Sequence, residues 1–453
     1  MTSPPPQPSP QQPKRWIQSE RRLARLLGRP VQAFLEIEAA SGLLLVVATV
    51  VAIGWANSPA RESYQDLFHT EIALSVGSFE LRESLTHWIN DALMAVFFFV
   101  VGLEIKREWV AGELRDRRAA ALPAFAALGG MVVPAIIFVA INTGGAGAPG
   151  WGIPVATDIA FALGVVALLG NRVPTPLKVF LLTLAIVDDI GAILIIAIFY
   201  SSSISLTWLA GAAAVVVAVV ALRRAHVVFH PAFVVLGVAL WLCVYESGAH
   251  ATLAGVAMGL LTPATPFLPE LEAEEVVDTL ENQSELSAVD VRRVGYLIGE
   301  SVPLTDRLLN LLHPWSSYVI VPLFALANAG IELSTEAFTG AGALTGGVVA
   351  GLVIGKTIGI SAFSWLAIRL GFGAMPADTR FPQLVGVAIL GGIGFTVSIF
   401  VAGLAFTDEA LIADAKIGVL VASVIAAAAG ALVITLTSGT NPDEVEASAA
   451  ADA

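Results

Sequence analysis

The chain is poor in charge and has almost no cysteine. Charged residues make up 13% of its 453 residues, about half of the 25% typical of soluble domains. The single Cys243 excludes a disulfide framework, a zinc site built from cysteines and a CxxC redox pair. Lysine and arginine number 24 against 37 acidic residues, and the net charge of −13 gives no support for a nucleic-acid partner.

Most of the chain consists of long apolar segments. Hydrophobic residues form 56% of the chain, and the mean hydropathy is +0.80. A helix needs about 20 apolar residues to cross a bilayer, so the blocks of high hydropathy predict an all-α polytopic membrane protein with twelve transmembrane helices. The predicted spans cover residues 35–56, 86–105, 121–141, 151–170, 176–200, 205–222, 231–246, 248–262, 314–331, 344–368, 382–406 and 411–437.

The positions of the cations give the orientation of these spans. Twenty of the 24 lie in the N-terminal tail and in alternate loops, and cytoplasmic loops are the ones enriched in Lys and Arg. These stretches are 14–29, 106–118, 172–178, 223–224, 292–307 and 369–380. The alternation predicts that both termini lie in the cytoplasm, with the lipid bilayer as the main partner of the chain.

Two connections are unusual. Residues 71–83 alternate apolar and polar positions around Gly77-Ser78, which predicts a short β-hairpin on the outer side. Residues 263–312 form an acidic cytoplasmic connection. The predicted organisation is therefore a basic cytoplasmic tail, spans 1–8, the acidic connection, spans 9–12 and an acidic cytoplasmic tail, with boundaries 1–34, 35–262, 263–312, 313–437 and 438–453.

Charged side chains inside the spans call for a role, because each costs about 2.5–3.5 kcal/mol at mid-bilayer on insertion scales. Away from the helix ends these residues are Asp91, Glu104, Asp158, Asp188, Asp189, His250 and Lys356.

Asp188 and Asp189 are the strongest candidates for a site, since they are adjacent near the middle of one span. Neighbouring helical residues cannot both point to the same side. Repulsion and desolvation favour protonation of at least one carboxylate, while two hard oxygen donors suit a small hard cation. The pair can therefore hold protons and a metal ion in competition, which couples two fluxes. A structural ion pair between helices is the alternative interpretation.

Two spans carry signs of a break in the helix. Pro154 and the polar step Thr157-Asp158 interrupt the fourth span, and the run 391–394 (GGIG) interrupts the eleventh. Broken helices inside a membrane occur where they line a protein cavity. A carboxylate such as Asp158 would offset facing helix N-termini. A cation such as Lys356 would offset facing C-termini or pair with an aspartate of the fifth span.

Asp91 and Glu104 each allow two interpretations, and two histidines are further candidates. Asp91 is either a helix-end cap or part of a pathway, and Glu104 is either a solvated end charge or part of an ion-entry funnel. His313, at the expected start of the ninth span, could sense pH because imidazole titrates near neutrality. His250 is expected to be a packing residue.

The breaks occupy corresponding positions in two oppositely oriented triplets of spans, which is typical of a transporter binding site.

Seven blocks carry a resemblance to a known family. They are WINDALMAVFFFVVGLEIKRE (88–108), PVATDIAFALGVVALLGNRVP (154–174), LAIVDDIGAIL (184–194), HATLAGV (250–256), HPW…PLFALANAG (313–330), GLVIGKTIGIS (351–361) and GGIGFTVSIF (391–400). In this order, and over residues 35 to 437, they resemble the NhaA family of sodium/proton antiporters.

The resemblance implies an inverted-repeat antiporter fold in which spans 4 and 11 are unwound and cross at mid-membrane. It implies electrogenic exchange of protons for sodium or lithium in the bacterial inner membrane, serving sodium and pH homeostasis, with no cofactor and no enzymatic activity. It also implies a homodimer formed through the 71–83 hairpin. By matching motif, Asp188 and Asp189 bind the ions, Asp158 compensates helix dipoles, Lys356 faces Asp188, Thr157 lies beside the site and Glu104 lies at the cytoplasmic funnel.

One segment departs from the family pattern. The turns before His313 read Asp306-Arg307-Leu308-Leu309-Asn310 and lack the glutamate and second histidine of that pattern. The resemblance therefore does not define the pH set-point or the steepness of activation, whereas the expected exchange chemistry is unchanged.

Two other functions use acidic residues inside a membrane. An intramembrane aspartyl protease needs two aspartates on different helices, typically in a GxGD-like context, whereas the paired aspartates here are adjacent on one helix and no GxGD occurs. A sodium-coupled symporter of an organic anion on a related fold remains the alternative, although symport does not require displaceable protons.

Overall fold

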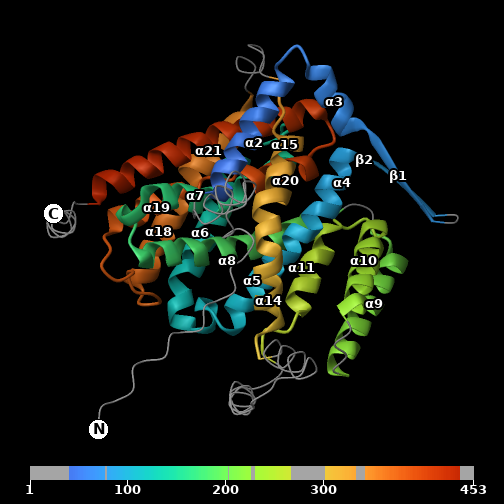
Figure 1. The fold of residues 1–453 in the computed structure, drawn as a ribbon. Coiled ribbons are helices and arrows are strands. Elements are labelled where there is room, and N and C mark those ends of the chain that lie inside the picture. Colours follow the sequence, from blue (N-terminus) through green and yellow to red (C-terminus); the bar gives the residue numbers. More distant parts are fainter. Residues whose placement is uncertain are drawn as a thin grey trace, which may run out of the picture.

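The computed structural model of the chain describes residues 40–76, 79–201, 204–225, 230–266, 301–332 and 342–438. In this part the protein is helical apart from one two-stranded sheet (Figure 1). The acidic connection and both predicted tails fall largely or wholly outside the described residues, as do the first residues of the first predicted span.

The helices and strands follow each other in this order. The first part of the chain contains α2 (Ala40–Ala56), α3 (Arg61–His69), β1 (Glu71–Val76), β2 (Phe79–Ser84), α4 (Leu85–Trp88), the π segment η3 (Ile89–Leu93), α5 (Met94–Val110), η4 (Glu113–Arg115), α6 (Arg117–Ile141), the 3-10 segment η5 (Ala148–Val155), α7 (Ile159–Leu169), η6 (Gly170–Arg172) and α8 (Thr175–Phe199). It continues with α9 (Leu206–Arg224), α10 (His230–Glu246), α11 (Thr252–Leu261), α14 (Leu304–Trp315), the π segment η7 (Ser316–Ile320), α15 (Val321–Asn328), α17 (Ala343–Val349), the π segment η8 (Ala350–Gly355), α18 (Lys356–Arg369), α19 (Phe381–Leu390), α20 (Phe395–Ala405) and α21 (Glu409–Thr437).

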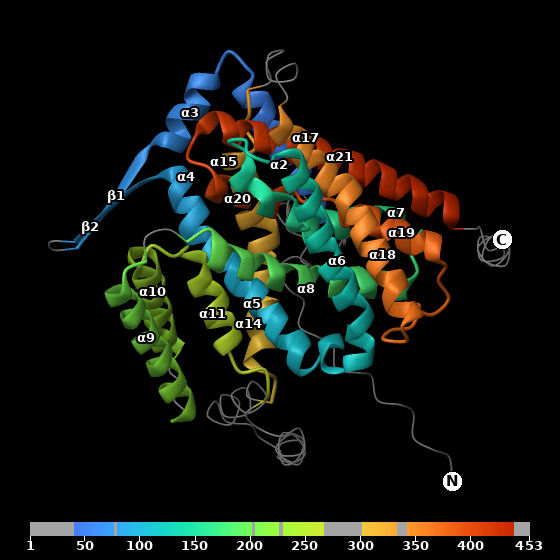
Figure 2. The same ribbon diagram turned by 180° about the vertical axis from the view of Figure 1, so that it is seen from behind.

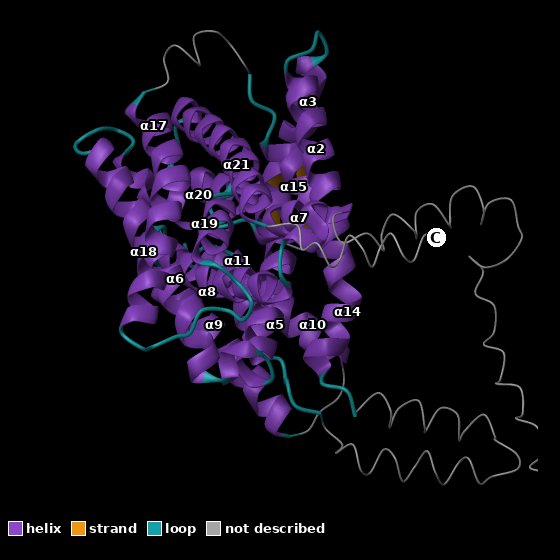
Figure 3. Ribbon diagram, turned by 90° about the vertical axis from the view of Figure 1, so that its left-hand side faces the viewer, coloured by secondary structure: helices purple, strands orange, loops and turns teal. Residues whose placement is uncertain are grey.

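Helices account for nearly all of the described chain (Figure 3). Among the described residues, eight helical segments are long and apolar enough to cross a membrane, and ten if each of two bent helix pairs is one span. The helices α10 and α11 are apolar but shorter. The protein is therefore a polytopic helical membrane protein. The number of twelve crossings stays a prediction.

The ninth predicted span begins earlier than the sequence suggested. Helix α14 starts at Leu304, so His313 and Pro314 lie inside it rather than at its start. A proline inside a helix has no N–H to donate and its ring crowds the preceding turn. The π segment η7 follows at Ser316, and such wider turns are where a helix absorbs a local irregularity.

Two groups of helices lie on opposite sides of the molecule (Figures 1 and 2). One group packs α6 against α18, α8 and η8, and α21 against α17 and α19. The other packs α5 against α11 and α14, and α10 against α9 and α11. Helix α8 contacts both α6 and α5, so a side chain near its middle can face either group.

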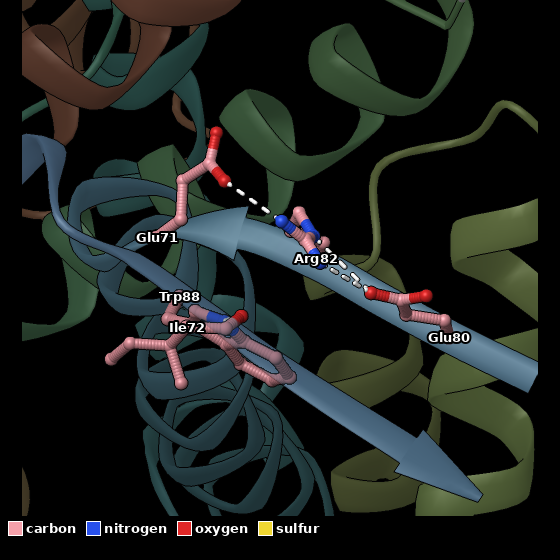
Figure 4. Close-up of polar contacts among 5 residues, drawn as sticks. All are labelled: Glu71, Ile72, Glu80, Arg82 and Trp88. Carbon is pink, nitrogen blue, oxygen red and sulfur yellow. Dashed lines mark hydrogen bonds and ion pairs between the residues drawn. The ribbon is translucent and has the colours of Figure 1, made fainter.

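The predicted hairpin segment forms an antiparallel pair of strands that projects from the helical body (Figure 1). Arg82 holds it from one side, because its guanidinium lies 2.8 Å from Glu80 Oε1 and 3.5 Å from Glu71 Oε2 (Figure 4). The indole of Trp88 donates a hydrogen bond of 3.1 Å to the carbonyl of Ile72. This bond ties β1 to α4, so the sheet has a fixed root on the fold.

Candidate functional site

The adjacent aspartates lie in the middle of α8, which runs without interruption from Thr175 to Phe199. Pro174 and Pro176 flank its first residue, and proline is favoured at the start of a helix. Asp188 is fully buried and Asp189 is 6% exposed. Successive helical residues point about 100° apart, so the two carboxylates serve different sides of α8.

Asp188 is paired with the buried lysine, as the sequence indicated. Its Oδ2 accepts a hydrogen bond of 2.5 Å from Lys356 Nζ, and neither side chain is exposed. The same ammonium donates to Thr157 Oγ1 at 3.0 Å, and Thr157 in turn donates to the carbonyl of Gly391 at 2.8 Å. One lysine therefore joins α8 to the breaks in both interrupted segments, with Thr157 between them.

The second oxygen of Asp188 is different. Asp188 Oδ1 is buried and accepts no hydrogen bond of good geometry from a described residue, although Thr157 lies near enough to act on the carboxylate. A buried acceptor without a donor costs about 1–3 kcal/mol, and ordinary folding does not maintain such a cost without a reason. The atom is thus a place where a proton or a cation would be stabilised.

Asp189 lies beside this pair and makes no hydrogen bond or ion pair with any described side chain. Its carboxylate is buried, and its neighbour Asp188 places a second buried acid on the same turn of α8. Like charges at short range in a low-dielectric interior strongly disfavour full ionisation. Two adjacent buried carboxylates therefore favour the uptake of a proton or a cation.

Lys356 is positioned by close contact between backbones. It is the first residue after the π segment η8, and Gly130 of α6 faces its aliphatic stem. A Cβ at Gly355 would meet the backbone of Pro134, and one at Gly359 would meet the carbonyl of Gly129. Only glycine allows α18 to approach α6 this closely, and this approach sets the depth of the lysine.

Asp158 links the two interrupted segments by hydrogen bonds. It is the N-cap of α7, where its Oδ1 accepts the N–H of Phe161 at 2.9 Å. Its Oδ2 accepts the N–H of Thr396 at 2.9 Å and the hydroxyl of the same residue at 2.6 Å. Its own N–H donates to the carbonyl of Ile393. One carboxylate thus faces the N-termini of α7 and α20, each of which carries a partial positive charge.

Thr396 was not among the predicted site residues, although it contributes two of these bonds. Its signal in the sequence is its place, the second residue of a helix that starts after the 391–394 break. At that position a free backbone N–H is available to a facing carboxylate.

Glu104 and His313 meet at the ends of α5 and α14. His313 Nε2 lies 3.8 Å from Glu104 Oε1, a separation that becomes an ion pair when the imidazole is protonated. Arg107 Nε lies 3.2 Å from Asp306 Oδ1 on the same two helices. Oppositely charged side chains therefore link α5 and α14.

Asp91 does not join this cluster. It lies in the π segment η3, and the charges that act on it are those of His87 and Glu83 at the same end of the span. Its backbone carbonyl accepts the indole N–H of Trp241 at 3.1 Å. The structure therefore supports a local role for the Asp91 backbone, and a pathway role for its side chain stays a prediction.

The site combines two adjacent buried carboxylates, one paired lysine and two facing helix breaks. The family model described as "Na+/H+ antiporter 1" matches residues 32–434. The chain belongs to this family. Among its relatives, the antiporter "Na(+)/H(+) antiporter NhaA" of Rhodopirellula baltica is 48% identical over 410 residues, which are 89% of this chain and 92% of the relative.

Other antiporters of the family are similar over comparable lengths. "Na(+)/H(+) antiporter NhaA 3" of Frankia alni is 46% identical over 89% of this chain and 88% of its own length. "Na(+)/H(+) antiporter NhaA 2" of Sorangium cellulosum is 46% identical over 92% and 91%. The NhaA resemblance found in the sequence is thereby confirmed, and the chain is placed among membrane transporters rather than enzymes.

Proposed function

We propose that this antiporter exports sodium, or lithium, in exchange for protons by alternating access at Asp188 and Asp189. The observation that carries the proposal is the contrast between the two carboxylates. Asp188 is bound to Lys356, while its neighbour Asp189 has no partner among the described side chains. A cation entering the pair competes with the lysine and with protons for the same oxygens.

The exchange follows from this competition. A sodium ion from the cytoplasm binds the carboxylate oxygens and releases the protons held there, and protons from the outer side later release the sodium. A doubly negative site would be costly in a low-dielectric barrier, so only the proton-loaded or sodium-loaded form crosses. More than one proton per sodium makes the cycle electrogenic and lets it serve sodium and pH homeostasis.

No group of three His, Cys, Asp or Glu side chains in the described part of the chain is arranged to hold a metal ion. Two carboxylates, completed by a hydroxyl such as that of Thr157 and by water, suit a cargo ion that must leave again.

The arrangement of the spans belongs to the same proposal. We take α2, α10, α11 and the bent pair α19–α20 as spans in addition to the eight long helical segments, which gives twelve, with both termini in the cytoplasm of a bacterial inner membrane. The breaks at 156–158 and 391–394 are the mid-membrane crossing of spans 4 and 11. Glu104 and His313 lie at the cytoplasmic entrance, and the hairpin joins two copies on the outer side.

The test is sodium-driven pH change in proteoliposomes that contain the purified protein and no organic solute. We expect the wild type to acidify or alkalinise the lumen according to the sodium gradient, with a rate that depends on an imposed voltage. Asp188→Asn and Asp189→Asn should each abolish it, whereas Asp66→Asn, on the exposed face of α3, should not. Full exchange by both variants would overturn the site, and a requirement for an organic anion would favour the symporter.

A further inference from the structure

Three buried phenylalanine rings, which we name the ring cluster, meet where one group of helices contacts the other. The ring of Phe400 on α20 contacts Phe98 of α5 and Phe324 of α15, with centroids 5.5 Å and 6.3 Å apart. The three side chains are only 4%, 4% and 1% exposed. Aromatic rings at these separations are in contact, which leaves no space for a hydrated ion between Phe400 and either neighbour.

The ring cluster joins elements of different groups. Helix α20 packs on η5 and α21, and its Thr396 binds Asp158, so it belongs with the elements that build the site. Helix α5 is part of the other group, and α15 packs on α2 and on the π segments η3 and η7, which adjoin α5 and α14. A movement of one group against the other would therefore pull Phe400 away from Phe98 and Phe324.

In the proposed orientation, the ring cluster lies on the outer side of the site. Thr396 precedes Phe400 by four residues, about 6 Å along α20 toward the outer end of that helix. On α5, Phe98 precedes Glu104 of the proposed cytoplasmic entrance by six residues, or about 9 Å. Phe324 lies one turn before the outer end of α15. An ion that leaves the site outward between the two groups therefore has to pass the ring cluster.

Phe98 and Phe324 form the seat of Phe400, and an amide pair holds the helices of this seat together. Asn328 Nδ2 donates to Asn90 Oδ1 at 2.8 Å, and Asn90 Nδ2 donates back to Asn328 Oδ1 at 3.3 Å. Asn328 Nδ2 also donates to the carbonyl of Phe324 at 3.0 Å. Each amide uses a donor and an acceptor on the other, so the pair fixes the distance between α15 and the segment that continues into α5.

A second contact fixes the same end of α15. The hydroxyl of Tyr64 on α3 donates to the carbonyl of Leu326 at 2.8 Å, and Tyr64 is only 6% exposed. The last carbonyls of a helix have no partner within it, so this hydroxyl satisfies one of them. Helix α15 is thus held by polar contacts from two sides, whereas its contact with Phe400 is apolar.

We propose that Phe400 and its seat form the outer seal of the ion site and that the Asn90–Asn328 pair positions this seal. The inference rests on the proposed exchange function and names the residues that close its outer side. While Phe400 is seated, an apolar constriction excludes water and ions, and the site exchanges with the cytoplasm alone. When the group that carries the site moves, Phe400 leaves the seat and the site opens outward. Without the seal the site would be open to both sides at once, and sodium would pass without a proton.

The first experiment measures coupling instead of speed. Proteoliposomes with the full-length protein are loaded with radioactive sodium, and sodium loss and luminal pH are recorded in the same sample. Phe400→Ala should lower the pH change per sodium ion lost severalfold, because sodium leaks past the empty seat. Phe400→Leu, which fills part of the space, should give a smaller drop and serves the same test if the alanine variant does not fold.

The matched control for this experiment is Phe138→Ala. Phe138 of α6 is fully buried but lies outside the ring cluster, so this variant should lower the unfolding temperature and keep the pH change per sodium ion of the wild type. An unchanged value in both Phe400 variants, or an equal fall in Phe138→Ala, would overturn the seal. If the wild type itself shows no sodium-driven pH change, the proposed function fails instead.

The second experiment tests the amide pair. Asn90→Ala leaves all three rings in place but removes one half of the pair, so it should lower the pH change per sodium ion less than Phe400→Ala does. Adding Asn90→Ala to Phe400→Ala should have no further effect, because no ring remains to be seated. A lower unfolding temperature of Asn90→Ala with the coupling of the wild type, or two effects that simply add, would show that the pair does not position the seal.

Discussion

Lys356 Nζ lies 2.5 Å from Asp188 Oδ2, and both side chains are completely buried. The pair is formed by residues on two helices, and the same lysine also binds Thr157. A buried ion pair is weak evidence for stability, but removal of one partner leaves a charge without compensation. The pair therefore links the stability of the fold to the occupancy of the site.

Replacement of the lysine should show this link. We expect Lys356→Ala to lower the free energy of unfolding by about 3–5 kcal/mol at neutral pH, since Asp188 would keep a buried charge with no partner. Thermal unfolding of the detergent-solubilised protein measures the change. The double variant Asp188→Asn/Lys356→Ala should recover part of the loss. If the effects of the two single variants simply add, the two residues are not coupled in the folded protein.

Gly355 should be needed for the position of Lys356. A methyl group at Gly355 would meet the backbone of Pro134, and overpacking of this kind costs about 1–3 kcal/mol. Gly355→Ala should therefore move the lysine away from Asp188 and change the pH dependence of exchange as well as lower the unfolding temperature. The control is Gly346→Ala on the same span, because nothing lies within 4 Å of a Cβ added at Gly346. Identical behaviour of the two variants would argue against a positioning role.

His313 should make exchange sensitive to acid. Its attraction to Glu104 exists only while the imidazole is protonated and the carboxylate is ionised, so the contact between α5 and α14 is restricted to the pH range in which both charges are present. We expect His313→Gln to change the ratio of the rate at acid pH to the rate at alkaline pH. Proteoliposome assays over a range of pH measure this ratio. His69→Gln, at an exposed histidine of α3, should leave the ratio unchanged, and an equal effect there would contradict the prediction.

The hairpin should hold two copies together. Ile72 and Leu74 of β1 are 41% and 55% exposed, and the sheet projects from the body on a fixed root. Replacement of residues 72–82 by two glycines should reduce the mass measured by light scattering in detergent from that of a dimer to that of a monomer. Sodium-driven exchange should persist, because no site residue lies in the sheet. Arg61→Ala, which breaks an exposed ion pair with Glu332 outside the sheet, should keep the mass of the wild type; a monomer there would show that the hairpin is not specific.

The helix breaks illustrate how far sequence alone can go. Pro154, the Thr157-Asp158 step and the 391–394 run predict interruptions because a helix there would lack donors or carry conformationally free glycines. Residues 156–158 and 391–394 are non-helical in the structure, and the N–H of Asp158 joins the two segments by donating to the carbonyl of Ile393. The contact joins residues far apart in the chain, so no local pattern contains it, and this is why Thr396 escaped prediction.

His313 shows the opposite limit. The absence of a glutamate before it was visible in the sequence, but the link between α5 and α14 was not, because Asp306 and Arg107 are on separate helices and only packing brings them to 3.2 Å. The predicted start of that span was also too late. The helix begins at Leu304, but its first turns carry polar residues, so hydropathy alone does not assign them to the span.

The low charge of the chain and its apolar blocks determined a membrane protein, because lipid accepts few charges. The small number of acids left inside the spans, together with one lysine, determined which residues to inspect. Tertiary structure decided what each of them does. Adjacent positions on α8 point to different sides of the helix. Close packing against α6 at Gly355 and Gly359 places Lys356 within hydrogen-bond distance of Asp188. Asp189 is left without a partner among the described side chains.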